Sequence, residues 1–383
     1  MCLCPLSSVV EHSLYMRVVG GSNPSAGTMT DYLSRKIKIV SFISILCVVF
    51  QHAINFTGYI DPSSTYAGQI NFNTVLQYIF GYGFARGAVA IFFILSGYLF
   101  FRNYILGKTV DKYTSRFRSL FIPYVLWGAL SILFVMLLQS TGAFSSLYTG
   151  VLSGKPFMEY LKIIANHGVA FQLWFLWDLM LYTLLAPLFY VVLKYTSVFL
   201  LIPLYILWML QVPLPPVFAF VYRGGLFYLL GAYIAMYGVY IPKEKVKPIA
   251  LISIIFWMVM LTIKTGIAFG IILSPYLKLS QIDNMAIIMG ISTLWFGYDK
   301  IASSKLMDLF LLATPFTFFL YASHEPLLEI VKQFGVTVTG RSDVSLLLLY
   351  GGSIILVLFL TIGCGILLKK LTPKLYSLLT GGR

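Results

Sequence analysis

The sequence predicts an all-α polytopic membrane protein of about ten transmembrane helices with both termini in the cytoplasm. Hydrophobic residues make up 59% of the 383 residues and charged residues only 10%, whereas a soluble domain needs more polar surface to meet water. Long, nearly uncharged stretches also recur along the chain, and each can cross a bilayer as a helix. The remaining polar positions are concentrated between these stretches, which is typical of a multi-pass protein.

Ten apolar segments separated by short polar breaks are the expected spans. A connection at about 140–170 separates the third from the fourth, and the sequence shows no internal repeat. The segments are 37–57, 79–101, 118–139, 171–193, 196–212, 222–241, 248–271, 281–298, 308–331 and 345–368.

The basic residues predict the orientation of these spans. With the N-terminus inside, 18 of the 27 Lys and Arg residues lie at cytoplasmic ends and loops, and seven lie at outer ones. Cytoplasmic loops of membrane proteins carry such an excess. The net charge of +14 is therefore spread over loops and not gathered in a patch for nucleic acid. The four cysteines lack metal-ligand spacing, so no metal site is expected.

The first 28 residues differ from the remainder of the chain. They lack the apolar core of a signal peptide, whereas Met29 opens "MTDYLSRKIKIV", with basic residues just before an apolar run. Residues 1–28 are therefore interpreted as a start-site artefact or a disordered leader, and 29–383 as a single membrane domain.

Three ionisable residues are predicted to lie at one depth in the membrane. At about 1.5 Å per residue, His52 lies roughly 21 Å above Lys38, and Arg86 lies roughly 24 Å above Arg102 on a descending helix. His324 lies roughly 24 Å above Asp308. Ionisable groups inside a membrane usually face a cavity, although a lone histidine is also found as a satisfied packing group. Depth alone is compatible with both interpretations.

Three further charged residues occur within or beside the predicted spans. Arg223 and Lys264 lie near helix ends and are expected to extend to the interface. Asp178 lies in the fourth span and is expected to pair with Arg86 or a histidine, because a buried carboxylate needs a partner.

An ordered set of short motifs resembles the membrane acyltransferase 3 family, integral membrane O-acyltransferases, in its glycan-modifying type. The central motif is an aromatic pair followed by Ser-Gly-Tyr within one span, and the resemblance covers residues 36 to about 372. The motifs are "VVFQHA", "RGAVAIFFILSGYLFF", "SRFRSLFIPYVLW", "LWFLWDLMLY", "FYLLGAYIA" and "YASHEPL". Many members carry an arginine eleven residues before the first-helix histidine, but this chain has Ser41 there. Arg86 is the candidate to supply that positive charge.

The resemblance implies transfer of an acyl group, usually acetyl from acetyl-CoA, to a hydroxyl of a cell-surface glycan. His52 is then the expected general base or transient acyl carrier, since histidine titrates near neutral pH. Arg86 would stabilise the thioester oxyanion or bind an acidic part of the substrate. His324 would be a second base, a proton relay or an orienting partner.

Other residues are assigned supporting roles by the same resemblance. Arg116 and Arg118 lie at the cytoplasmic side and are expected to bind the phosphates of the donor, although loop charge or contact with anionic lipid explains them equally well. Ser96 belongs to a small-residue helix face and is interpreted as a packing residue. The remaining supporting residues are Tyr98, Trp174, Asp178 and Tyr321.

The predicted partners are acyl-CoA, a glycan or lipid-linked glycan acceptor, and lipid of a bacterial cytoplasmic membrane, with no bound cofactor. The main alternative is a transporter or flippase for a polysaccharide or its lipid-linked precursor, which would favour repeated halves and helices broken near the midplane. A structural subunit is the third alternative, and it would leave the layer of His52, Arg86 and His324 without a purpose.

Overall fold

The computed structural model describes residues 31–56, 66, 68–142, 151–215, 224–239, 241–273, 276 and 278–382. Over these residues the chain forms helices and connecting turns and contains no strand. The predicted leader, residues 1–28, and Arg223 lie outside the described residues.

Helices occupy most of every predicted apolar segment, but several segments are divided by a break. The segment at 171–193, for example, is split between two helices on either side of Leu185. The helices are α2 (Asp31–His52), α3 (Phe72–Tyr78), α4 (Gly87–Phe101), α5 (Thr109–Arg116), α6 (Ile122–Ser140), α7 (Phe157–Ala165), α8 (Trp174–Leu184), α9 (Ala186–Thr196), α10 (Leu201–Leu210), α11 (Leu226–Tyr237), α12 (Lys243–Ala268), α13 (Leu279–Ile301), α14 (Lys305–Ala313), α15 (Thr317–Thr339), α16 (Asp343–Leu371) and α17 (Pro373–Thr380).

Six helical runs among the described residues are long and apolar enough to cross a membrane. α2 and α13 also fall in predicted spans and are 22 and 23 residues long. Both are more polar, since α2 begins with several basic residues and α13 carries Asp283 and Asn284. The six runs are Phe72–Phe101, Leu106–Ser140, Ala186–Leu210, Glu244–Ala268, Lys305–Thr339 and Asp343–Leu371.

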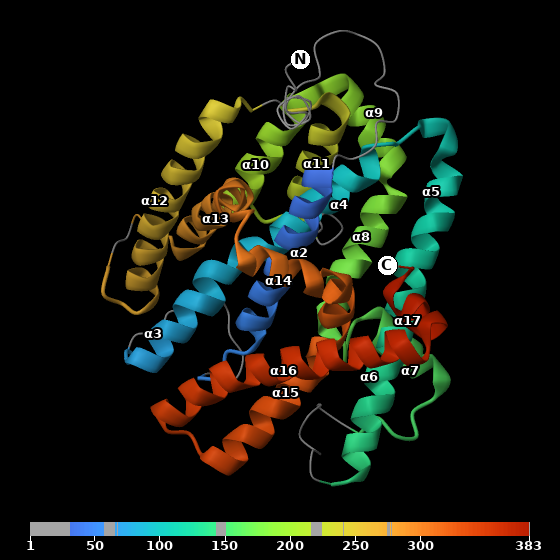
Figure 1. Cartoon of the computed structure of the whole chain (residues 1–383), viewed down its shortest axis with the longest axis vertical. Helices are drawn as coiled ribbons and strands as arrows, with labels where there is room; N and C mark the ends of the chain where they lie inside the picture. Colours follow the sequence, from blue (N-terminus) through green and yellow to red (C-terminus); the bar gives the residue numbers. More distant parts are fainter. Residues whose placement is uncertain are drawn as a thin grey trace, which may run out of the picture.

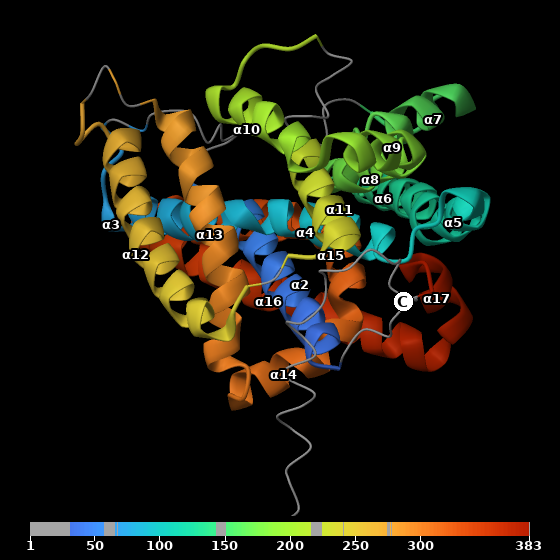
Figure 2. The ribbon, with the colours of Figure 1, turned by 90° about the horizontal axis from the view of Figure 1, so that it is seen from above.

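The helix α2, which carries His52, lies in the middle of the molecule beside α4. α12 and α13 lie on one side of this centre, and α5 and α17 lie on the other (Figure 2). Three pairs of helices pack along one another, namely α12 with α13, α4 with α11, and α15 with α16 (Figure 1).

Ion pairs at the start of α2 join it to two other helices. Arg35 Nη2 lies 2.6 Å from Asp308 Oδ1 of α14, and Lys36 Nζ lies 2.8 Å from Asp299 Oδ2 of α13. Asp308, from which the depth of His324 is counted, therefore contacts Arg35, which lies three residues before Lys38, from which the depth of His52 is counted.

The close contact between α4 and α11 depends on two glycines. A Cβ atom at Gly97 would collide with the Tyr228 carbonyl oxygen of α11, and one at Gly231 would collide with the Ile94 carbonyl oxygen of α4. Small residues allow helix backbones to approach in this way. Gly97 thus has the packing role that the sequence predicts for its helix face.

We expect Gly231→Ala to lower the free energy of unfolding by about 1–3 kcal/mol, because overpacking must separate the two backbones. Gly363→Ala on α16 is the matched control, since no atom lies within 4 Å of its added Cβ. In that position alanine is expected to be neutral or stabilising. Denaturant unfolding of the purified protein measures both changes, and equal effects would contradict the close contact.

Candidate active site

A cavity of about 460 Å³ lies among the ends of several helices. Its wall includes His52 from α2, Arg86 from the turn before α4, Gln172 from the turn before α8, and Trp174, the first residue of α8. Asn284 of α13 and Tyr321 of α15 complete its polar lining together with Gln51 and Gln211. Two of the three residues predicted to share a depth therefore face the same space.

His52 is the last residue of α2, and its ring lies between two aromatic neighbours. The ring centroid is 5.4 Å from that of His324 and 5.1 Å from that of Phe171. Lys332 Nζ donates a 2.9 Å hydrogen bond to the His52 carbonyl oxygen. A cation at a helix C-terminus is favourable because the last carbonyls are partly negative, so Lys332 stabilises the end of α2 where the histidine lies.

Buried amides hold the chain that follows His52. The Asn55 backbone N–H donates to Gln77 Oε1 (3.0 Å), and Gln77 Nε2 donates to Asn55 Oδ1 and Asn73 Oδ1 (2.9 and 2.7 Å). Asn55 Nδ2 donates to the Leu346 carbonyl oxygen. Sequence reasoning missed this network, although Asn73 and Gln77 are amide residues four positions apart just before the predicted span at 79–101.

His324 is buried behind His52 with one tautomer selected by the backbone. Its Nδ1 lies 2.8 Å from the Tyr321 carbonyl oxygen and 3.2 Å from that of Leu320. A carbonyl oxygen only accepts, so Nδ1 carries the hydrogen and Nε2 keeps its lone pair in the neutral ring. Nε2 is buried and has no hydrogen-bond partner among the residues that the structure describes. This nitrogen therefore keeps an unused lone pair on the ring next to His52.

Gln172 supplies hydrogen bonds to the backbone at a break in α15 next to His324. Pro326 has no N–H to donate to the Ala322 carbonyl oxygen, and Glu325 has non-helical backbone angles. Gln172 Nε2 donates instead to the carbonyl oxygens of Ala322 and Glu325, both at 3.0 Å. Tyr321 Oη donates in turn to the Gln172 carbonyl oxygen (2.7 Å). These bonds join the turn before α8 to the histidine-bearing helix, and the sequence does not identify Gln172.

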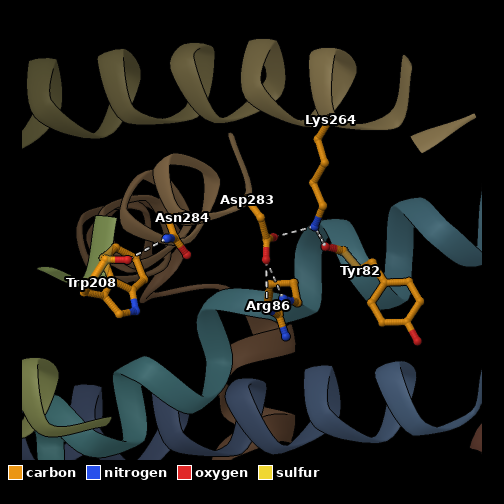
Figure 3. Close-up of polar contacts among 6 residues, drawn as sticks. All are labelled: Tyr82, Arg86, Trp208, Lys264, Asp283 and Asn284. Carbon is orange, nitrogen blue, oxygen red and sulfur yellow. Dashed lines mark hydrogen bonds and ion pairs between the residues drawn. The ribbon is translucent and has the colours of Figure 1, made fainter. Parts of the chain in front are cut away.

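Arg86 belongs to a buried cluster with Asp283 and Lys264 (Figure 3). Its Nε and Nη2 both donate to Asp283 Oδ2, at 3.0 and 2.8 Å. Lys264 Nζ lies 2.5 Å from Asp283 Oδ1 and also donates to the Tyr82 carbonyl oxygen. The partner of Arg86 is thus Asp283, so of the two alternatives expected for Asp178 the pairing with Arg86 is wrong. The expectation that Lys264 extends to the interface is also wrong, because its side chain is 1% exposed and bound to this carboxylate.

The supporting residues predicted from the sequence lie in three different places. Trp174 and Tyr321 line the cavity, whereas Ser96 and Tyr98 lie further along α4, where Tyr98 packs near the start of α2. Asp178 is fully buried on α8.

Arg116 and Arg118 diverge, although only one residue separates them. Arg116 lies over the Phe100 ring, with its guanidinium carbon 5.6 Å from the centroid. Arg118 lines a second cavity, of about 760 Å³, between the α5–α6 junction and α17. Lys374 and the hydroxyl groups of Thr114, Ser115 and Ser377 share that wall with Asp111. Only Arg118 therefore reaches an open polar space.

His52 and Arg86 line one cavity, and His324 is buried behind His52. Together with the helical runs of membrane-spanning length, this arrangement defines a multi-pass membrane protein with ionisable side chains at a cavity. The model of the acyltransferase domain of the acyltransferase 3 family matches residues 36–369, and the chain belongs to this family. It is an O-acyltransferase that transfers groups other than amino-acyl groups. No curated protein and no solved structure matches the chain.

Proposed function

We propose that the protein transfers an acetyl group from acetyl-CoA to a hydroxyl of a cell-surface or exported polysaccharide, and that the reaction occurs at His52. The observation that carries this proposal is the cavity in which His52 faces the open space, with His324 directly behind it and Arg86 in the same wall. A sugar hydroxyl is a poor nucleophile at neutral pH, so a base beside it is the first requirement of the reaction.

The two histidines have different roles in the proposed proton transfer. As the hydroxyl oxygen attacks the thioester carbonyl carbon, His52 takes the hydroxyl proton, and the new C–O bond forms while the C–S bond breaks. The proton then passes from the histidine to the thiolate of CoA, so that the products are the O-acetyl sugar and the free thiol. His324 has an unprotonated Nε2 and a ring centroid 5.4 Å from that of His52, and it is the proposed second base beside His52.

The donor binds from the opposite end of the bundle. In the proposed topology, ten spans cross a bacterial cytoplasmic membrane and both termini lie in the cytoplasm, where acetyl-CoA is made. Arg118 and Lys374 then offer two cations to the phosphates of CoA from the cytoplasmic cavity. The pantetheine arm has to extend from there to His52.

Incubation of protein-containing membranes with acetyl-CoA labelled in the acetyl group tests the proposal. Label is expected to enter the glycan fraction in an alkali-labile ester and to be absent with membranes of the same host that lack the protein. His167→Asn is the matched control variant, because His167 lies outside the cavity and has a positive φ that asparagine tolerates. It should retain the activity, and failure of any glycan to take label would overturn the proposal.

A further inference from the structure

The cluster of Arg86, Asp283 and Lys264 carries one more positive than negative charge. Lys264 and Asp283 are withdrawn from solvent, with side chains 1% and 7% exposed, whereas Arg86 is partly exposed. Among the described residues that line the cavity beside it there is no carboxylate. An uncompensated charge is costly in such surroundings, so this wall of the cavity favours an anion.

The arginine has hydrogen-bonding capacity left for that anion. One carboxylate oxygen of Asp283 accepts from Nε and Nη2 of Arg86, and the other accepts from Lys264. Nη1 of Arg86 therefore makes no hydrogen bond to Asp283. The Arg86 side chain is 28% exposed, far more than its two partners, and it lines the cavity. Figure 3 shows one terminal nitrogen of Arg86 directed away from Asp283. Guanidinium groups bind carboxylates with strong, directional hydrogen bonds.

The other walls of the cavity suit a sugar ring. Trp174, Trp208 and Phe227 provide apolar faces, and Asn284 and Gln211 provide amides. Gln172 Oε1 is buried and has no hydrogen-bond partner among the described residues, so it needs a donor such as a hydroxyl. A volume of about 460 Å³ is within the range of small-molecule sites.

From these features we propose that the acceptor is an acidic sugar, whose carboxylate binds Arg86 while a neighbouring hydroxyl lies at His52. This inference rests on the proposed function, and it names the class of acceptor. Arg86 then contributes to acceptor binding, because its guanidinium binds the negative charge of the sugar. Asp283 and Lys264 position the guanidinium for this contact.

Binding of two matched probes to the purified protein tests the assignment without requiring turnover. Methyl β-D-glucuronide carries the carboxylate, and its methyl ester has the same ring and hydroxyls but no charge. We expect the ester to bind at least about tenfold more weakly, since a hydrogen bond to a charged group is lost. The same weakening is expected for the glucuronide with Arg86→Gln, and a smaller one with Arg86→Lys. Thermal unfolding of each variant identifies any that fails to fold, and the comparison of probes on the unaltered protein does not depend on the variants.

Equal binding of the two probes to the unaltered protein would overturn the assignment, and so would binding of the glucuronide that is unchanged in a folded Arg86→Gln variant. Either result would be expected if Arg86 served only the thioester oxyanion. The proposed function is judged separately by the labelled glycan fraction. Label in neutral glycans alone would refute the acidic acceptor and leave acetyl transfer standing, whereas charge-dependent binding without any transfer would refute the proposed reaction.

Discussion

Replacing His52 with alanine is expected to lower the rate of acyl transfer by about 10²–10⁴-fold, the usual contribution of a general base. The side chain lies in the cavity wall, and no hydrogen bond holds its ring to another described residue. Lys332 binds the backbone carbonyl oxygen of residue 52. Alanine retains this oxygen, so the end of α2 keeps the contact. The loss should therefore appear in turnover, with little change in thermal unfolding.

Comparison with His324→Ala shows whether the histidines act as a pair. If His324 acts together with His52, the double variant should be little slower than His52→Ala alone, because groups that act as a unit give non-additive effects. Initial rates with labelled acetyl-CoA measure all three variants, with His167→Asn as the histidine control. Transfer that proceeds at the unaltered rate in His52→Ala would remove His52 from the mechanism.

The second large effect is a loss of stability, which we expect from Asp283→Ala. This change leaves the buried Lys264 and the partly exposed Arg86 beside each other without a carboxylate, and removing one partner of a buried ion pair in this way typically costs about 3–5 kcal/mol. The free energy of unfolding of the purified protein, measured by denaturant titration, should fall by about that amount.

Two companion variants assign the cause of that loss. Asp308→Ala removes the carboxylate of an ion pair whose side chains are 34% and 64% exposed, so it should cost only about 0–1 kcal/mol. Asp283→Ala combined with Lys264→Met removes one of the stranded cations and should recover part of the stability. Equal losses for Asp283→Ala and Asp308→Ala would show that the buried cluster is not held by charge.

The local pattern of residues was sufficient to predict helices, their approximate places and the small-residue face at Gly97. Apolar runs and helix periodicity are properties of neighbouring residues, and the helices α12 and α16 accordingly coincide closely with predicted segments. The interruptions were not predicted. The break at Glu325 next to Pro326 is maintained by Gln172, which lies 150 positions away from Ala322 along the chain, and no local pattern contains that contact.

For the candidate site, too, the sequence predicted some features and not others. Counting residues from the charged ends of the helices places His52, Arg86 and His324 in one layer, because depth along a helix depends only on sequence separation. The partner of Arg86 could not be found by such counting. Asp178 and Asp283 both lie in apolar segments, and the selection of Asp283 depends on the position of α13 beside the start of α4.

The sequence by itself determined that this chain is a helical membrane protein, that it resembles the acyltransferase 3 family, and that ionisable groups lie deep within it, since composition and short motifs carry that information. Only the tertiary structure decided what surrounds those groups. It selects the tautomer of His324 through two backbone carbonyl groups, seats Lys264 on Asp283, and separates Arg116 from Arg118. Each of these depends on the packing of side chains and backbone in three dimensions, which residue order alone does not specify.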